Sequence, residues 1–80
     1  MTTAEAERYG KQLAEFLRLR ALNLRVSQQR LAEAAGVTRQ TMNDWLNGRT
    51  FISITALIDV CPLLNLTPAE ALEAAKHQTI

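Results

Sequence analysis

Residues 28–48, QQRLAEAAGVTRQTMNDWLNG, contain the pattern that decides the fold of this chain. Ser27 is suited to cap a helix of about eight residues, because its hydroxyl can accept a backbone hydrogen bond from the first turn. Gly36 ends this helix, since a glycine adopts the left-handed conformation of a tight turn without strain. Thr38 is suited to cap a second helix, over about 39–46. The segment therefore predicts two short helices joined by a tight turn.

Each of the two predicted helices has one apolar face and one polar face at helical spacing. The apolar positions, which we expect to be buried, are Leu31, Ala32, Ala35, Val37, Met42, Trp45 and Leu46. Ala32 is small, which allows the two helices to cross closely. The polar positions of the second helix are Arg39, Gln40, Asn43, Asp44 and Asn47. The polar face of the second helix is suited to hydrogen bonding with a partner.

A long helix is predicted before this segment. It starts at Thr3 or Ala4 and continues through Leu22. Gly10 lies in its early part and costs ~1 kcal/mol relative to alanine, which favours fraying before that point. The apolar stripe that should cover the central pair of helices consists of Leu13, Leu17, Ala21 and Leu24, with Phe16 beside it.

A fourth helix is predicted after the central segment, with Ser53 as its cap. Helical spacing gives it core positions at Ile54, Leu57, Ile58, Cys61 and Leu64. Pro62 lacks a backbone donor and clashes one turn back, so this helix should kink or end around 60–61.

A fifth helix is predicted by the capping box that Thr67 and Glu70 form around Pro68. This helix should continue through about Lys76, with Leu72 as its main apolar anchor. The chain is therefore expected to be all-α, a compact bundle of about five short helices.

The length and composition indicate one domain. The chain has 80 residues and only 5% of them are aromatic, so its core should be aliphatic and helical. We expect residues 1–80 to form a single domain with flexible ends at 1–4 and 77–80. No internal repeat suggests a second unit.

The single cysteine, Cys61, excludes an intramolecular disulfide, and no cluster of metal ligands accompanies it. This favours a reducing, cytoplasmic compartment and predicts neither a metal nor another cofactor. The N-terminal residues lack the basic and apolar regions of a secretion signal. Asp59 interrupts apolar runs that are far shorter than the ~18 residues of a membrane span, so no membrane partner is expected.

The net charge of +1 conceals an uneven distribution. The range 8–49 contains eight basic and three acidic residues, a local charge of +5, whereas the remainder has one basic and five acidic residues, a charge of −4. Such a basic body is typical of a surface that binds phosphate, because salt-dependent attraction depends on the local patch.

The central segment resembles the helix-turn-helix of the lambda-repressor and Cro-like (XRE-type) family of DNA-binding regulators. The features that match in register are Gln28 at the start, Ala32 at the crossing, Gly36 and Val37 in the turn, Met42 and Trp45 in the second helix, and the Asn47-Gly48 ending. The resemblance covers roughly 13–72. It implies a nucleoid-associated bacterial or phage transcriptional regulator, most simply a repressor, that binds double-stranded DNA with helix 39–46 in the major groove.

Three side chains of the second helix are our candidates for contacts to DNA bases, namely Arg39, Gln40 and Asn43. An arginine can donate two hydrogen bonds to guanine and a glutamine can pair with adenine, each worth roughly 1 to 3 kcal/mol of discrimination. The competing interpretation is an ordinary solvated helix face. Candidates for phosphate contacts are Gln28, Thr38, Thr41, Asn47 and Arg49. The resemblance further implies that Gln28 braces the second helix, and Asn47 has a helix C-cap as its alternative role.

Two charged residues, Asp44 and Arg30, each have more than one role that fits the sequence. Asp44 either accepts from cytosine or, more simply, forms an ion pair with Arg49 or Arg39, since phosphates repel a carboxylate. The resembling family often has, at the position of Arg30, an acidic residue that pairs with an arginine near the end of the first helix. Arg30 instead pairs with Glu15 or Glu33, or contacts a phosphate.

The sequence favours binding over catalysis. It contains no nucleophile with a nearby base, no paired carboxylates and no phosphate-cradling glycine loop, so neither an enzyme nor a small-molecule substrate is expected. The alternative function is a helix-turn-helix used for protein contact, as in an antitoxin-like partner-binding protein. Similar proteins often bind DNA as dimers, with half-sites about 34 Å apart. Apolar candidates for such self-association are Phe51, Ile52, Leu72 and Ile80.

Overall fold

A computed structural model describes residues 2–78 of the chain. Within this range the structure is all-helical, as the sequence predicts, and it contains five α-helices and one 3₁₀ helix. The elements in chain order are α1 (Thr3–Leu24), α2 (Gln28–Ala35), α3 (Arg39–Leu46), α4 (Ile54–Val60), the 3₁₀ helix η1 (Cys61–Leu64) and α5 (Pro68–Lys76).

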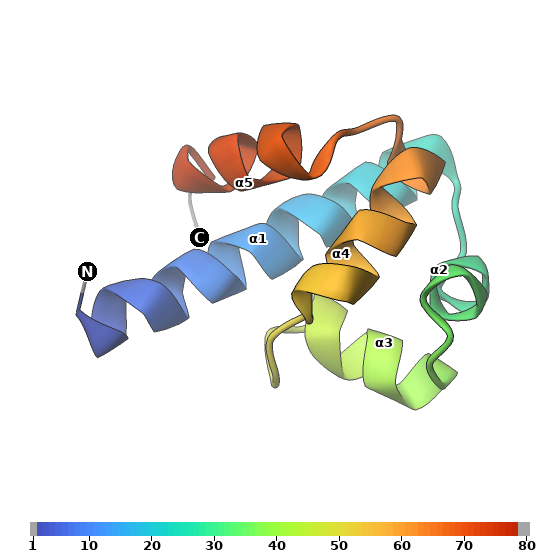
Figure 1. The fold of residues 1–80 in the computed structure, drawn as a ribbon, viewed down its shortest axis with the longest axis horizontal. Helices are drawn as coiled ribbons and strands as arrows, with labels where there is room; N and C mark the ends of the chain where they lie inside the picture. The colour runs from blue at the N-terminus through green and yellow to red at the C-terminus, as the bar shows by residue number, and fades with distance from the viewer. Residues whose placement is uncertain (1, 79–80) are drawn as a thin grey trace.

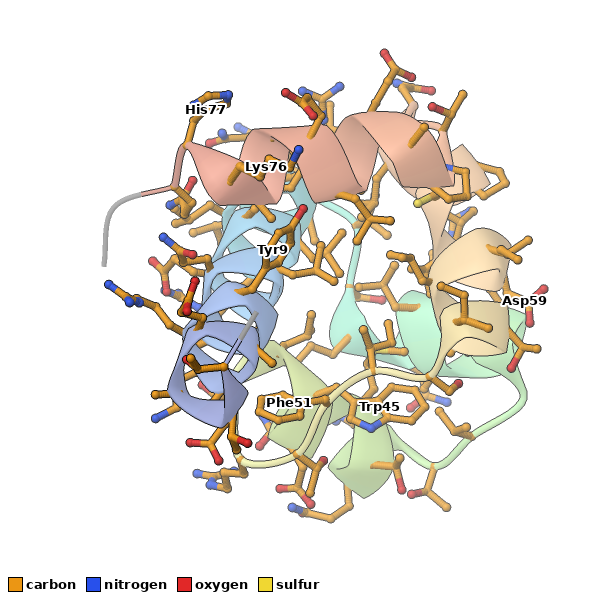
Figure 2. The ribbon with its side chains drawn as sticks, turned by 60° about the vertical axis from the view of Figure 1, so that its left-hand side comes forward. Tyr9, Trp45, Phe51, Asp59, Lys76 and His77 are labelled. Atoms are coloured by element: carbon orange, nitrogen blue, oxygen red, sulfur yellow. The ribbon has the colours of Figure 1, made fainter. Side chains whose placement is uncertain are left out.

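The helices are arranged around the long helix α1. Helix α5 lies alongside α1, while α2, α3 and α4 pack together and α3 occupies the side of the molecule opposite α5 (Figure 1). The Tyr9 side chain points from α1 toward α5 and donates a hydrogen bond to the carbonyl oxygen of Leu72 (Figure 2). Because α3 packs against α2 and α1 and lies on the side opposite α5, no other helix of residues 2–78 covers its outer side.

The helices begin where side chains replace missing backbone partners. The hydroxyls of Ser27, Thr38 and Ser53 each accept from the backbone N–H three residues later. The Thr67 and Glu70 capping box that the sequence predicts is present at α5. A second capping box, formed by Thr2 and Glu5, starts α1 at Thr3. Residues 2–4 therefore belong to the cap and first turn of α1, although the sequence analysis assigned them to a flexible end.

The core lies where α1, α2, α3 and α4 meet. Fully buried side chains include Leu17, Leu31, Met42, Leu57 and Leu64. The predicted stripe of α1 is buried at Leu13, Leu17 and Ala21, together with Ala14. Leu24 is 39% exposed, so the expectation that it extends this stripe is wrong. It lies in the last turn of α1, where the chain leaves the bundle for α2.

Two of the predicted core positions of α4 are wrong. Ile54 is 62% exposed and Ile58 is 51% exposed, whereas Leu57, Cys61 and Leu64 are buried as expected. The inner face of α4 instead includes Ala56 and Val60. Apolar residues occupy both sides of this helix, so periodicity alone did not identify the side that faces the core.

The C-terminal part of the fold also differs from expectation at one residue. Leu72 is only partly buried, and the fully buried residues of α5 are Ala71 and Ala75. These two small side chains are part of the core, whereas Leu72 packs against it from a partly exposed position. Pro62 lies in η1, which continues directly from α4 and confirms that the α-helix ends at Val60.

No helix in residues 2–78 has the length and apolar character of a membrane-spanning segment.

Candidate nucleic-acid interface

The turn between α2 and α3 has the geometry that its sequence predicts. Gly36 has a φ of 68°, and its N–H donates to the carbonyl oxygen of Glu33 at 3.2 Å. The N–H of Val37 donates to the carbonyl oxygen of Ala32 at 3.0 Å, which completes the end of α2. A Cβ atom on Gly36 would meet nothing within 4 Å. The turn thus requires glycine for its backbone conformation and not for lack of space.

The inner faces of α2 and α3 hold the two helices together. Leu31 and Ala32 of α2 are each 1% exposed, and Met42 of α3 has no exposed surface. Trp45 is partly buried and packs against this core, which agrees with its predicted inward position. Small Ala32 is buried, as the predicted close crossing of the helices requires. Because the inner face of α3 is used in this way, its polar residues are directed outward.

A polar network connects the outer side of α3 to α2 and to the loop that follows α3. Nδ2 of Asn43 donates to Oε1 of Gln28 at 3.1 Å, which links α3 to the first residue of α2. Arg49 donates from the same terminal nitrogen to Oδ1 of Asn43 and to Oδ1 of Asp44, both at 3.1 Å. Nε2 of Gln40 donates to that Asp44 oxygen at 3.0 Å. Five polar side chains are thereby joined across three segments.

Asp44 has a structural partner in this network. Its carboxylate forms an ion pair with Arg49, which is one of the two partners that the sequence analysis proposed. The hydrogen bond between Gln28 and Asn43 also gives a physical basis to the bracing of α3 that the resemblance implied. Neither the bond from Gln40 to Asp44 nor that from Arg49 to Asn43 was predicted. Spacing of four residues on one helix could have indicated the first of these.

Arg39 and the two threonines lie at the start of α3. Arg39 is exposed and borders a shallow hollow of about 360 Å³ that Gln28, Gln40 and Asn43 also line. The Thr38 hydroxyl caps the N–H of Thr41 at 3.1 Å and donates to the Thr41 hydroxyl at 3.0 Å. The start of α3, with Asn43 one turn further along and Gln28 of α2, therefore brings a cation and three amides to the rim of one concave surface.

Asn47 has the C-cap role that the sequence analysis kept as its alternative. Its backbone N–H donates to the carbonyl oxygen of Asn43 at 3.0 Å, and its side-chain Nδ2 donates to the same oxygen at 2.8 Å. Gly48 follows with a φ of 72° and leads the chain away from α3. The side chain of Asn47 is exposed, so its amide is also accessible to a ligand.

The arginines of α1 and α2 are not arranged as in the resembling family. Arg20 donates from Nε to the carbonyl oxygen of Leu64 at 3.0 Å and so ties α1 to η1. Glu15 pairs with Arg18 at 2.7 Å, and Glu33 accepts from Gln29 at 3.4 Å. Among residues 2–78, Arg30 forms no ion pair, so its predicted pairing with Glu15 or Glu33 is wrong. Both carboxylates have closer neighbours on their own helices.

The candidates for self-association do not share one environment. Phe51 is 51% exposed and extends toward the early part of α1 (Figure 2), where a Cβ atom on Gly10 would be 2.7 Å from its ring. Ile52 and Leu72 are partly buried against the core. Ile80 lies outside the described residues. The Phe51 ring occupies the place that a larger side chain at position 10 would need, which accounts for a glycine within α1 at the point where the sequence predicts fraying.

The arrangement of α2 and α3 defines a helix-turn-helix protein: two short helices pack against each other, a left-handed glycine joins them, and the second presents a polar face. The family described as a helix-turn-helix domain matches residues 12–74, and the chain belongs to this family. This confirms the resemblance that the central segment indicated, and membership is consistent with DNA binding. The comparisons with curated proteins and with solved structures give no match.

Proposed function

We propose that this protein binds double-stranded DNA sequence-specifically, with α3 in the major groove, and acts as a transcriptional regulator. The observation that carries the proposal is the outer face of α3, where Arg39, Gln40 and Asn43 line one hollow beside the N-terminus of α2. An α-helix fits the width of the major groove, and these side chains have the donors and acceptors that base edges require.

Base contacts are assigned to Arg39, Gln40 and Asn43. Arg39 is exposed in the first turn of α3, where a side chain reaches most directly from the helix into the groove. Asn43 is bonded to Gln28 and Arg49, but its amide still has one hydrogen and one lone pair for a base. Gln40 keeps its carbonyl oxygen and one amide hydrogen free for a base.

Phosphate contacts are assigned to the residues that surround this face, Gln28, Thr38, Thr41, Asn47 and Arg49. Gln28 begins α2, whose N-terminus favours an anion through its free backbone donors and its dipole. Arg30, two residues further along α2, is exposed and joins these residues as a phosphate contact. Such contacts fix the register of α3 on the duplex without selecting a sequence.

Repression by occlusion of a promoter is the simplest regulatory outcome for a small DNA-binding domain, and we place the protein with the bacterial nucleoid in the cytoplasm. Two copies on half-sites one helical turn apart would double the contacted sequence. Phe51, Ile54 and Ile58 are each at least half exposed and lie within eight consecutive residues, so they offer an apolar surface to a second copy or another protein.

The test is selection of binding sites from random duplexes, followed by affinity measurements at two salt concentrations. We expect one enriched motif, a higher affinity for it than for a scrambled duplex, and a steep loss of affinity with salt on both. Failure to bind duplex DNA even at low salt would overturn the proposal and leave protein contact as the function. The number of copies per duplex, measured by sedimentation, separates monomer from dimer.

A further inference from the structure

We propose that the ion pair between Arg49 and Asp44 sets which end of the Gln28 and Gln40 amides faces the DNA. Under this inference, which rests on the proposed function, Gln28 presents a hydrogen-bond donor to a phosphate and Gln40 presents an acceptor to a base. Asp44 is then a positioning residue that determines specificity without itself touching a base.

Amides and charged groups differ in the hydrogen bonds that they can form. An amide has a donor end and an acceptor end of nearly equal size, so packing alone selects neither orientation. A guanidinium has only donors and an ionised carboxylate has only acceptors. An amide that contacts either charged group is therefore oriented by it.

Arg49 orients the amide of Asn43 directly and, through Asn43, the amide of Gln28. Its terminal nitrogen can meet only an oxygen, so Asn43 must direct Oδ1 toward Arg49, at 3.1 Å. Nδ2 of Asn43 then faces Gln28, which must offer Oε1, also at 3.1 Å. The remaining end of the Gln28 amide is Nε2, which has no hydrogen bond within residues 2–78. At the first residue of α2, this donor is suited to a phosphate oxygen.

Asp44 orients the amide of Gln40 in the opposite sense. Its carboxylate oxygen can meet only a donor, so Gln40 directs Nε2 toward it, at 3.0 Å. Oε1 of Gln40 has no hydrogen bond within residues 2–78 and lies on an exposed side chain beside Arg39. The same Asp44 oxygen also accepts from Arg49, which keeps the carboxylate in place.

The outward oxygen of Gln40 restricts the bases that it can contact. In the major groove, adenine N6 and cytosine N4 are exocyclic amines that donate, whereas guanine O6 and thymine O4 accept. Nε2 keeps a second hydrogen, but it is held at Asp44, so the free end of the Gln40 amide is its oxygen. Gln40 should therefore favour adenine or cytosine over guanine or thymine at the position it faces. We expect a discrimination of roughly five- to 150-fold at this single position, as is typical of a specific side-chain contact to a base.

The experiment compares the sites selected by the unaltered protein, by Asp44→Ala and by Asp59→Ala. Alanine at position 44 removes the acceptor that Gln40 Nε2 meets, so the Gln40 amide can turn over. We expect the preference for adenine or cytosine to fall to within about twofold at one position, with the other positions unchanged. Asp59→Ala is the matched control, because Asp59 is an exposed carboxylate on α4 with no hydrogen bond or ion pair within residues 2–78 (Figure 2). It should leave every position unchanged.

A second measurement needs no DNA. In the free protein, Asp44→Ala should shift the NMR signals of the Gln40 side-chain amide but not those of Gln12, whose amide donates to the Gln78 carbonyl oxygen. A Gln40 amide that does not respond, or an Asp44→Ala protein with unaltered base preference, would overturn the inference. If the unaltered protein selects no sequence, the proposed function itself is wrong. The same experiment therefore separates a failure of the proposed function from a failure of this inference.

Discussion

Helices α3 and α4 are consecutive, similar in length and capped in the same way, yet their outer faces differ. The outer face of α3 has Arg39 and Gln40 exposed, whereas that of α4 has Ile54 and Ile58. Periodicity predicted the burial of α3 correctly because its polar residues mark the outside. On α4 both sides are apolar, and the pattern therefore did not distinguish the core from the surface. In such short helices, the polar residues show which face is exposed to solvent.

The largest effect should come from substitutions on the two sides of α4. Leu57→Ala removes a side chain that is 1% exposed and should lower the free energy of unfolding by about 2 to 5 kcal/mol. Ile58→Ala removes a half-exposed side chain and should change it by less than about 0.5 kcal/mol. Urea denaturation measures both. Equal losses would show that Ile58 belongs to the core after all.

A substitution on the outer face of α3 should affect binding and not stability. Arg39→Ala should cost roughly 1 to 3 kcal/mol on the selected site and leave nonspecific affinity nearly intact. The matched control is Arg8→Ala, which removes the same charge beside Lys76 on the side of α1 that faces α5. Titrations on selected and scrambled duplexes measure both variants. A loss of equal size on the two duplexes would assign Arg39 to phosphate contact only.

The two N-caps allow the same chemical change in both helices. Thr38→Ala and Ser53→Ala each remove a hydroxyl that accepts from a backbone N–H, and each should destabilise the fold by about 1 kcal/mol. Thermal unfolding measures this cost. Thr38→Ala should in addition weaken binding to all DNA sequences alike, as loss of a phosphate contact does. If Ser53→Ala weakened binding to the same extent, the proposed interface would have to include the start of α4.

The loop between α3 and α4 can be tested through its contact with α1. Gly10→Ala should stabilise the Phe51→Ala protein by about 1 kcal/mol through helix propensity, but should stabilise the unaltered protein clearly less. In the latter the new Cβ atom would be 2.7 Å from the Phe51 ring, which must move. A double-mutant cycle of unfolding free energies measures the coupling. No coupling would mean that Phe51 does not rest on Gly10 in solution.

The smallest effect concerns Cys61, directly after α4. Burial raises the pKa of its thiol, with a further contribution from the Glu70 carboxylate. The unfolded chain therefore loses this proton first as pH rises, so the free energy of unfolding should fall above the ordinary pKa of a thiol and level off above the raised one. Cys61→Ala should remove that part of the alkaline slope. An identical slope in both proteins would contradict a raised pKa.

Much of the candidate site was predictable because it depends on local features. Ser27, Thr38 and Gly36 act through backbone groups within a few residues, so their positions alone identified both helices and the turn. The ion pair of Asp44 with Arg49 was also predictable, since the partners are close in sequence. The link between Gln28 and Asn43 was not predicted from the residues, because it joins different helices and depends on how they cross.

The sequence by itself determined the boundaries of α2 and α3, the glycine turn and the polar character of α3, because capping, left-handed backbone conformation and amphipathic spacing are local properties. Only the tertiary structure decided which side of α4 is buried, that Arg20 bonds to the Leu64 carbonyl and that Phe51 rests on Gly10. These choices depend on contacts between residues far apart in the chain. The orientation of the amides beside α3 belongs to the same class, since charged neighbours brought together by folding select it.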